Sequence, residues 1–214
     1  MLYETLLPDL RSYVKDRKQE ILGTNEPFRL QFLAQGEYNI NYLLETNTKK
    51  LVLRVNTASQ IQQENQIKYE YDSLQILRSS GVTPAPDYLD DTKSAIPYGL
   101  LTMEYLNGRP LHYETDLAKA ARIFGTIHSL PVPDDHHLIT EEKPCTARIH
   151  EATTLLANIW DSDALDLPVK RFFDRLMDWA VMNHGVESYF LENRHFVINN
   201  TEVNSSNFII GQSN

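Results

Sequence analysis

The sequence predicts an α+β protein built of two lobes, and three observations support this fold class. Between residues 28 and 106, short runs of β-branched and aromatic residues alternate with polar turns, which is typical of an antiparallel sheet. A long helical pattern interrupts this region after its third strand, and apolar residues recur at helical spacing after residue 107. We therefore expect a five-stranded antiparallel lobe over residues 1–106 and a helical lobe over residues 107–214.

The composition excludes several classes of protein. The 214 residues, 42% of them apolar, can bury a core without metal or disulfide staples, and Cys145 has no second cysteine with which to form an internal disulfide. The formal net charge is −9, and residues 111–214 carry −7 of it, from 8 Lys and Arg against 15 Asp and Glu. No basic stripe indicates a nucleic-acid binder, and no apolar run or leader pattern indicates a membrane span or a signal peptide. A cytoplasmic location is expected.

The first elements are a helix and a strand meander. The helix should open at Pro8 and end at Gly23, with Leu10, Tyr13 and Ile21 on its apolar face. Three strands should follow, at residues 28–35, 40–46 and 51–55, separated by turns at residues 36–39 and 47–49.

The rest of the chain alternates helices with short extended segments. A helix from about Ser59 to Ser80 should end at Gly81, because glycine readily takes the left-handed conformation of a helix stop. Two prolines then favour an extended loop at residues 82–86. The remaining expected elements are a strand at residues 98–106, helices at residues 114–130, 147–160 and 169–183, and short strands at residues 196–198 and 208–210.

Two charged residues stand at positions that favour apolar ones. Arg54 lies in an apolar strand, where it shares a face with Val52, and Glu70 lies on the apolar face of the long helix. A carboxylate on that face is costly unless it is paired, so Arg54 and Glu70 are expected to form an ion pair if the helix packs on the sheet. The alternative is an exposed arginine, or pairing with another glutamate nearby in the sequence.

Two polar segments could bind a ligand. Gly36, in the turn that ends at Asn39, would let the backbone approach a phosphate closely, although a hairpin glycine is usually only part of a turn. The loop at residues 199–207 contains Glu202 and Asn207, whose oxygen atoms suit Mg²⁺. Polar loops between strands are common, so each feature alone is weak.

The order of these features resembles the kinase signature set, and most closely the aminoglycoside phosphotransferase and choline kinase branch of kinase-like enzymes. Residues 51–54 stand where that branch has its strand lysine, and the segment from Glu70 through Pro84 and Pro86 is similar to its helix-and-proline segment. Residues 101–108 are similar to its hinge, which ends in a glycine, and residues 127–131 to the end of its first C-lobe helix. The resemblance covers residues 28–214 and implies a protein-kinase-like fold.

The resemblance implies an ATP-dependent phosphotransferase that moves the γ-phosphoryl group of ATP to a hydroxyl group of a small molecule, with Mg²⁺ as cofactor. It implies that Arg54 binds phosphate oxygens, that Glu70 holds Arg54, and that the backbone from Gly36 to Asn39 covers the phosphates. Further implied roles are adenine contacts from Glu104 to Leu106, the catalytic base at Glu202 and a magnesium ligand at Asn207.

The chain departs from the pattern of the branch at three points. Arg54 replaces a lysine, and Glu202 replaces an aspartate in the catalytic loop, where Asn207 matches outright. The sequence ends at Asn214, before the metal-binding aspartate and the later helices of the branch. We therefore expect an incomplete phosphotransferase whose 214 residues alone have no appreciable activity.

Two other functions remain open. The chain could be a non-catalytic nucleotide-binding or regulatory module that keeps Arg54 and Glu70 but has lost the chemistry of its catalytic loop. It could also bind a metal through residues 134–137, although adjacent side chains in a loop point in different directions. The sequence does not indicate the acceptor or the oligomeric state, and the charge of the second half slightly favours a cationic acceptor.

Overall fold

The structure is a computed structural model that describes residues 1–59, 63–160, 162–163, 165–200 and 204–211. The chain forms two compact units, one of residues 1–138 with 197–214 and the other of residues 139–196. These units do not follow the lobe boundary expected at residue 106, and the assignment of residues 1–106 to nucleotide binding stays a prediction. No helix in the described ranges is long and apolar enough to cross a bilayer.

The first unit is built on the predicted five-stranded antiparallel sheet. Its strands follow the spatial order β1-β2-β3-β5-β4, so β1 and β4 form the edges. The expected loop at residues 82–86 leads into β4, which pairs with β5 and supplies the fifth strand. The strands are β1 Arg29–Gln35, β2 Asn39–Glu45, β3 Lys50–Asn56, β4 Pro86–Asp90 and β5 Gly99–Glu104.

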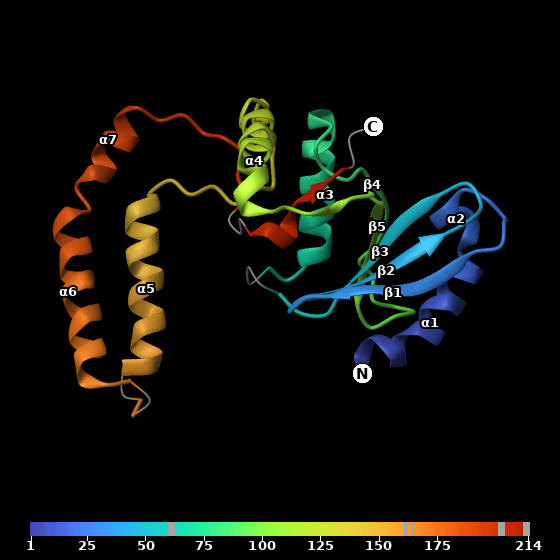
Figure 1. Cartoon of the computed structure of the whole chain (residues 1–214), viewed down its shortest axis with the longest axis horizontal. Helices are drawn as coiled ribbons and strands as arrows, with labels where there is room; N and C mark the ends of the chain where they lie inside the picture. The colour runs from blue at the N-terminus through green and yellow to red at the C-terminus, as the bar shows by residue number, and fades with distance from the viewer. Residues whose placement is uncertain (60–62, 161, 164, 201–203, 212–214) are drawn as a thin grey trace. The chain divides into compact units, whose positions relative to one another are not determined.

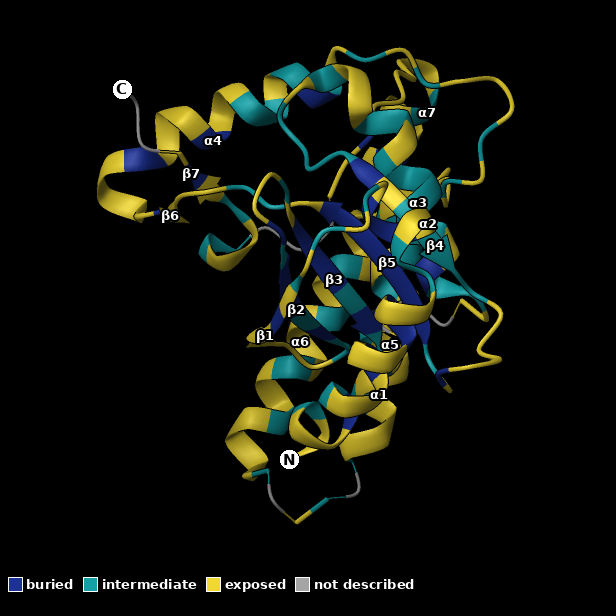
Figure 2. Cartoon of the chain, turned by 90° about the vertical axis from the view of Figure 1, so that its right-hand side faces the viewer, coloured by how far each residue is buried: buried dark blue, intermediate teal, exposed yellow. Residues whose placement is uncertain are grey.

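Helices cover both faces of this sheet. Alternate residues of β3 point to opposite faces, so Leu53 and Val55 join the core cluster of α1 (Leu2–Asp16), while Val52 joins the cluster of Ile67 from α3 (Gln66–Leu77). Figure 1 shows α1 and α3 on either side of the strands. Figure 2 shows β3 and β5 as largely buried strands in the middle of the sheet. The core therefore lies in two layers, one on each face.

The first helix begins six residues before the predicted start. It runs through Pro8, which removes one hydrogen bond from the helix interior. Its buried side chains include Leu6, Leu10 and Val14, and their burial against the sheet offsets that loss. The short helix α2 (Lys18–Leu22) follows, and Gly23 ends it as predicted, in the left-handed conformation with φ 67°.

The long helix predicted from Ser59 is shorter than expected. Residues 60–62 lie outside the described part of the chain, and α3 begins at Gln66, after Asn65 caps it by accepting a hydrogen bond from the Lys68 amide. The cap explains the later start, because an asparagine side chain satisfies an amide that the helix leaves unpaired. A short 3-10 turn, η1 (Arg78–Ser80), leads to the predicted stop at Gly81.

The rest of the first unit joins α4 (Tyr113–His128) to the end of the chain. The two-residue strand β6 (Arg109–Pro110) pairs with β7 (Ile209–Ile210), and the short turn η2 (Ser205–Asn207) precedes β7. The strand expected at residues 196–198 is wrong. That segment has no ladder partner among the described residues, and of its three apolar side chains only Ile198 is buried.

The described residues of the second unit form three helices. The structure confirms helices over most of the two predicted ranges, as α5 (Pro144–Trp160) and α6 (Leu167–Asn183), and adds the unpredicted α7 (Val186–Glu192). The buried Glu187 carboxylate ties α7 to α5 by accepting hydrogen bonds from the Thr146 amide and hydroxyl, at 2.9 and 2.5 Å. These bonds lower the pKa of Glu187.

The packing of α3 on β5 makes a stability prediction. A Cβ atom at Gly99 would overlap with the buried side chain of Ile67, which is branched and confined within its helix. Gly99→Ala should lower the free energy of unfolding by about 1–3 kcal/mol, as overpacking does. Gly125→Ala is the matched control, because Gly125 lies in α4 and a Cβ there would have no described atom within 4 Å beyond its own helix backbone and chain neighbours. This change should be neutral or stabilising by up to about 1 kcal/mol. Equal urea midpoints for G99A and the wild type would contradict this packing.

Candidate nucleotide site

The centre of the candidate site is Arg54 on β3. It lies opposite Asn41 of β2 and Leu101 of β5 in the sheet, and directly opposed side chains share a face. The Arg54 Nη1 atom donates to Oε1 of Glu70, and its Nε donates to Oδ1 of Asn41 at 2.9 Å. The ion pair expected between Arg54 and Glu70 is therefore formed. The contact with Asn41 was not expected.

Glu70 reaches Arg54 because α3 lies close to the sheet. Ile67, three residues before Glu70 and 1% exposed, packs against Val52 and Leu101, and Gly99 leaves room for it. Residues three apart on a helix share a face, so the packing of Ile67 also turns Glu70 toward the sheet. The Asn65 side chain adds a tether at the start of the helix by donating to Asp91 at 2.7 Å.

The ion pair is partly buried, with side-chain exposures of 23% for Arg54 and 22% for Glu70. Burial lowers the pKa of Arg54 to about 10, which leaves the guanidinium charged at neutral pH. A guanidinium carries five N–H donors, and the bonds to Asn41 and Glu70 use two of them. Within the described residues, the other N–H donors of Arg54 have no protein acceptor, so they are available to bind an anion.

The turn between β1 and β2 lies beside the end of β3. Asn39 pairs with Asn56, two residues after Arg54, and the Gly36 amide donates to the Asn39 carbonyl at 2.9 Å. The Tyr38 carbonyl accepts from the Thr57 amide at 2.8 Å, which fastens the turn to the chain after β3. Among the described residues other than its chain neighbours, the atom nearest to a Cβ at Gly36 would be the Asn39 carbonyl oxygen at 3.9 Å, so packing against them does not require a glycine there.

The segment after β5 is held by its neighbours in the sheet. The Glu104 amide donates to the Ala85 carbonyl at 2.8 Å, and the Glu104 carboxylate accepts from the Ala85 amide at 3.3 Å. The Tyr105 amide donates to the Lys50 carbonyl at 3.4 Å. For Leu106, the described part of the chain offers its amide no backbone acceptor, so this donor is available to a ligand.

The loop that contains Asn207 is fixed to the linker between β5 and α4. The Ser205 amide donates to the Tyr113 hydroxyl at 3.0 Å, and the Ser205 carbonyl accepts from the Leu111 amide at 3.3 Å. A Cβ atom at Gly108 would lie 2.5 Å from the Ile210 carbonyl oxygen, so a glycine is needed where β6 meets β7. The position of Asn207 thus depends on contacts with the linker.

A buried carboxylate anchors the linker itself. Asp116, 1% exposed, pairs with Arg109 at 2.6 Å and with Lys119 at 3.0 Å, and it accepts from the His112 amide at 3.0 Å. Bonds from Arg109, then His112 and Lys119, hold the pKa of Asp116 well below its usual range. Asp116 therefore stays charged and keeps the linker and the start of α4 together.

The structure thus joins some of the predicted site residues and leaves others apart. Arg54 and Glu70 are bonded, and Gly36 and Asn39 lie in the turn beside β3. Glu104 and Leu106 lie at and after the end of β5, and Asn207 lies in the loop beside the linker. Glu202 lies outside the described residues. The ligand roles of all eight residues stay predictions.

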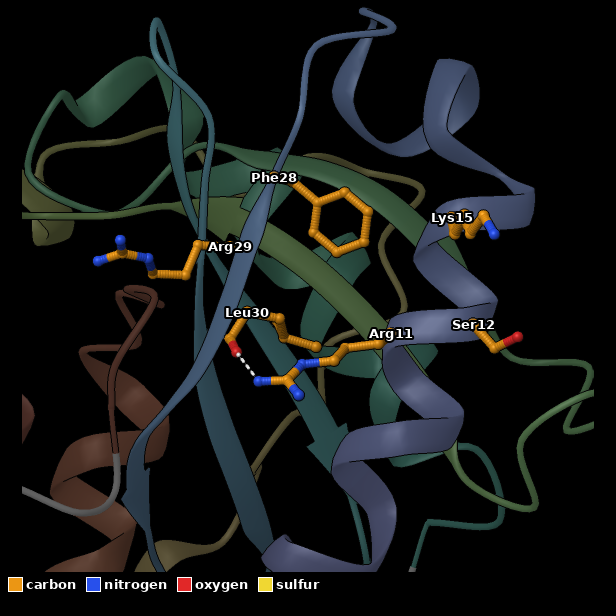
Figure 3. A pocket seen from close by; sticks show the side chains of 6 residues that line it. All are labelled: Arg11, Ser12, Lys15, Phe28, Arg29 and Leu30. Carbon is orange, nitrogen blue, oxygen red and sulfur yellow. Dashed lines mark hydrogen bonds between the residues drawn. The ribbon is translucent and has the colours of Figure 1, made fainter.

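Two further features lie apart from the candidate nucleotide site. A cavity of about 500 Å³ lies between α1 and β1, and Figure 3 shows Arg11 reaching toward β1, where its Nη2 donates to the Leu30 carbonyl at 3.2 Å, while Lys15 and Ser12 point away from the strand. Within the described ranges, no three His, Cys, Asp or Glu side chains gather as a metal site. In the segment 134–137, His137 instead packs edge-on against Tyr69 of α3.

The model of the phosphotransferase enzyme family matches residues 29–185, which is more than half of the chain. The chain belongs to this phosphotransferase family. No curated protein matches its sequence.

Solved structures similar to this phosphotransferase-family chain share its protein-kinase-like fold at low sequence identity. Spectinomycin phosphotransferase APH(9)-Ia, solved with ADP and spectinomycin, has 13% identity and a TM-score of 0.56, over 94% of this chain and 65% of that one. Aminoglycoside phosphotransferase APH(4)-Ia has 15% identity and a TM-score of 0.55, and the match covers 82% of this chain and 61% of that one. A protein from Ralstonia eutropha, provisionally assigned as an aminoglycoside phosphotransferase, has 19% identity and a TM-score of 0.54. The match covers 81% of this chain and 52% of that protein. The chain thus spans between half and two thirds of these three proteins.

The Asp116 contacts predict a pH-dependent stability for this phosphotransferase-family chain. Because the pKa of Asp116 is lower in the folded chain, its charge stabilises the fold above the ordinary aspartate pKa of about 3.9, and this contribution is lost as the pH falls through the folded-state value. Asp116→Asn should lower the free energy of unfolding at neutral pH and flatten its decrease below about pH 5. Urea unfolding at a series of pH values measures both effects.

The control for this experiment is Asp87→Asn, which removes an exposed carboxylate that pairs with Lys49. An exposed ion pair contributes about 0–1 kcal/mol, so D87N should follow the wild type across the pH range. If D116N and D87N give the same curve, Asp116 does not anchor the linker.

Proposed function

We propose that the chain binds ATP through residues of its sheet and serves a phosphotransferase that moves the γ-phosphoryl group to a hydroxyl group of a small molecule. The observation that carries this proposal is the ion pair between Arg54 of β3 and Glu70 of α3. In kinase-like enzymes, a strand cation held by a helix glutamate binds the nucleotide phosphates. The family match and the ADP in the spectinomycin phosphotransferase structure support the same function.

Arg54 is suited to bind phosphate. Its guanidinium is charged, is fixed by two bonds and keeps N–H donors that the described residues do not use. Hydrogen bonds between arginine and phosphate are charge-assisted and often bidentate, which adds geometric specificity. In this function Glu70 does not touch the nucleotide, and it acts by orienting Arg54 and balancing its charge when no nucleotide is bound.

The turn and the segment after β5 would contact the other parts of the nucleotide. Packing against the described residues does not require a glycine at position 36, and a ligand phosphate close to the backbone is a reason that fits its position beside β3. The Leu106 amide and the Glu104 carbonyl would meet the edge of adenine, since the amides of Glu104 and Tyr105 already donate within the sheet.

The donor chemistry of the chain fits Mg²⁺ at Asn207. Its side chain carries an amide oxygen, a hard donor, in a loop that the linker holds in place. Mg²⁺ is usually held by few protein groups, while phosphate oxygens and water complete its shell. Bound there, the ion would neutralise the charge of the transferring phosphoryl group.

Glu202 is the proposed general base. It would accept the proton of the acceptor hydroxyl as that oxygen bonds to the γ-phosphorus, while the bond from phosphorus to the ADP oxygen breaks. The acceptor is proposed to be a small hydroxylated molecule. The net charge of −7 over residues 111–214 favours a cationic one.

A second function is favoured by one sequence observation. Glu202 stands where the resembling enzymes have aspartate, and one extra methylene can move a carboxylate by about 1 Å, which can cost on the order of 10²-fold in rate. The chain would then be a module that binds a nucleotide without transferring phosphate.

The proposal predicts that ADP binding depends on Glu70. In the presence of Mg²⁺, ADP at 100 times its Kd should stabilise the wild type by about 2.7 kcal/mol, seen as a rise in Tm. Glu70→Gln removes the charge that holds Arg54 and should weaken ADP binding by about 10- to 100-fold. Isothermal titration calorimetry measures the Kd. The matched control is Asp72→Asn. Asp72 lies on the same helix, and its carboxylate pairs with Lys68, whose side chain is more exposed than that of Arg54, so its loss should leave the Kd unchanged.

Three outcomes test the site and the two functions. ADP binding that E70Q weakens, together with transfer of labelled γ-phosphate from ATP to a hydroxylated aminoglycoside, supports the phosphotransferase and overturns both the non-catalytic module and the expectation that these 214 residues alone are inactive. The same binding without transfer, to this acceptor or to water, supports the nucleotide site and agrees with the non-catalytic module and with an incomplete phosphotransferase. If the wild type binds no ADP, or if D72N and E70Q bind equally, the proposed site is wrong.

A further inference from the structure

We propose that Asn41 is a positioning residue that fixes the guanidinium of Arg54 for phosphate binding, so that Asn41 and Arg54 work as a matched pair. This inference rests on the proposed function, because it assigns Asn41 a part in the same nucleotide site. Asn41 would not touch the nucleotide. It would act through Arg54.

The sheet places Asn41 next to Arg54 without the help of α3. The two residues are directly paired in the β2–β3 ladder, so their side chains leave the same face of adjacent strands. The Arg54 Nε atom lies 2.9 Å from Oδ1 of Asn41. Because a guanidinium can only donate hydrogen bonds, the Asn41 amide must present its oxygen to Arg54.

Asn41 and Glu70 hold different nitrogen atoms of one planar group. Glu70 accepts from Nη1 and Asn41 accepts from Nε, so the plane of the guanidinium is fixed at two points. A single bond to Glu70 would leave the plane free to turn about that bond. With both bonds made, the N–H donors that remain on Nη1 and Nη2 keep fixed directions, and such preorganised donors favour binding to phosphate oxygens.

This arrangement gives a physical reason for arginine on β3. A lysine could still pair with Glu70, but its ammonium is a single point charge with no second nitrogen along the side chain for Asn41 to hold. Asn41 can therefore fix the plane of the cation only when an arginine stands at position 54. The effect of changing Asn41 should depend on which cation is present.

The test is the Kd for ADP with Mg²⁺ in four chains: the wild type, N41L, R54K and the double variant. Asn41→Leu keeps the size of the side chain and removes the acceptor, so it should weaken ADP binding by about tenfold, the equivalent of one charge-assisted hydrogen bond of about 1.4 kcal/mol. In the R54K chain, the same change should alter the Kd by less than about twofold. Thermal unfolding at millimolar ADP extends the measurement to weak binding.

A purely structural role of Asn41 would not show this dependence. Loss of fold around β2 would weaken ADP binding equally with arginine and with lysine, and that result would overturn the proposal. Gln31→Leu is the control, because Gln31 is an exposed residue of β1 opposite Leu43, on the same face of the sheet as Asn41. It should bind ADP as the wild type does.

The remaining outcomes also decide the matter. If N41L does not fold, Asn41→Ser serves in its place, because a shorter side chain also withdraws the acceptor from Nε. Wild-type ADP binding that neither Asn41 variant weakens would overturn the role of Asn41 and leave the nucleotide site standing. A wild type that binds no ADP would overturn both the site and this inference.

Discussion

Glu70 can neutralise Arg54 only because α3 packs closely on the sheet, and that packing depends on the contact between Ile67 and Gly99. The ion pair is itself a poor source of stability, since two partly buried charges lose much of their hydration. Its value lies in orientation. Three secondary structure elements, β2, β3 and α3, each contribute one side chain to it, so any shift of one element disturbs the same guanidinium.

The core of this arrangement is predictable from the sequence. Strand alternation places Arg54 on the face opposite Leu53, and the helical spacing of Ile67, Glu70 and Leu74 places the carboxylate on the apolar side of its helix. A buried charge needs a partner, and this requirement alone is enough to pair the two residues. The start of the first helix was predicted wrongly, because proline usually stands at the start of a helix and the helix was expected to open at Pro8. The burial of Leu6 and Leu10 outweighs that preference, and the helix runs through Pro8.

The hydrogen bond between Arg54 and Asn41 could not be predicted from the sequence, because it depends on the register of β2 against β3. A turn of three residues at 47–49 would place Tyr42 opposite Arg54. In the structure, the four residues 46–49 join the two strands, and the Thr46 hydroxyl holds this turn by accepting a hydrogen bond from the Lys49 amide at 3.0 Å. The residue opposite Arg54 is therefore Asn41 and not Tyr42. A shift of one residue moves every side chain to the other face. The position of the fifth strand, β4, was not predicted either, because the strand begins at Pro86, a residue that favours a loop.

The most direct test of this account is the ¹⁵N–¹H NMR spectrum of the chain during titration with ADP and Mg²⁺. The account predicts that the Nε–H signal of Arg54 and the backbone amide of Leu106 shift together with one Kd, while the signals of Arg11 and Leu30, at the cavity between α1 and β1, stay in place. Shifts at Arg11 and Leu30 without a change at Arg54, or no shift at all, would contradict it.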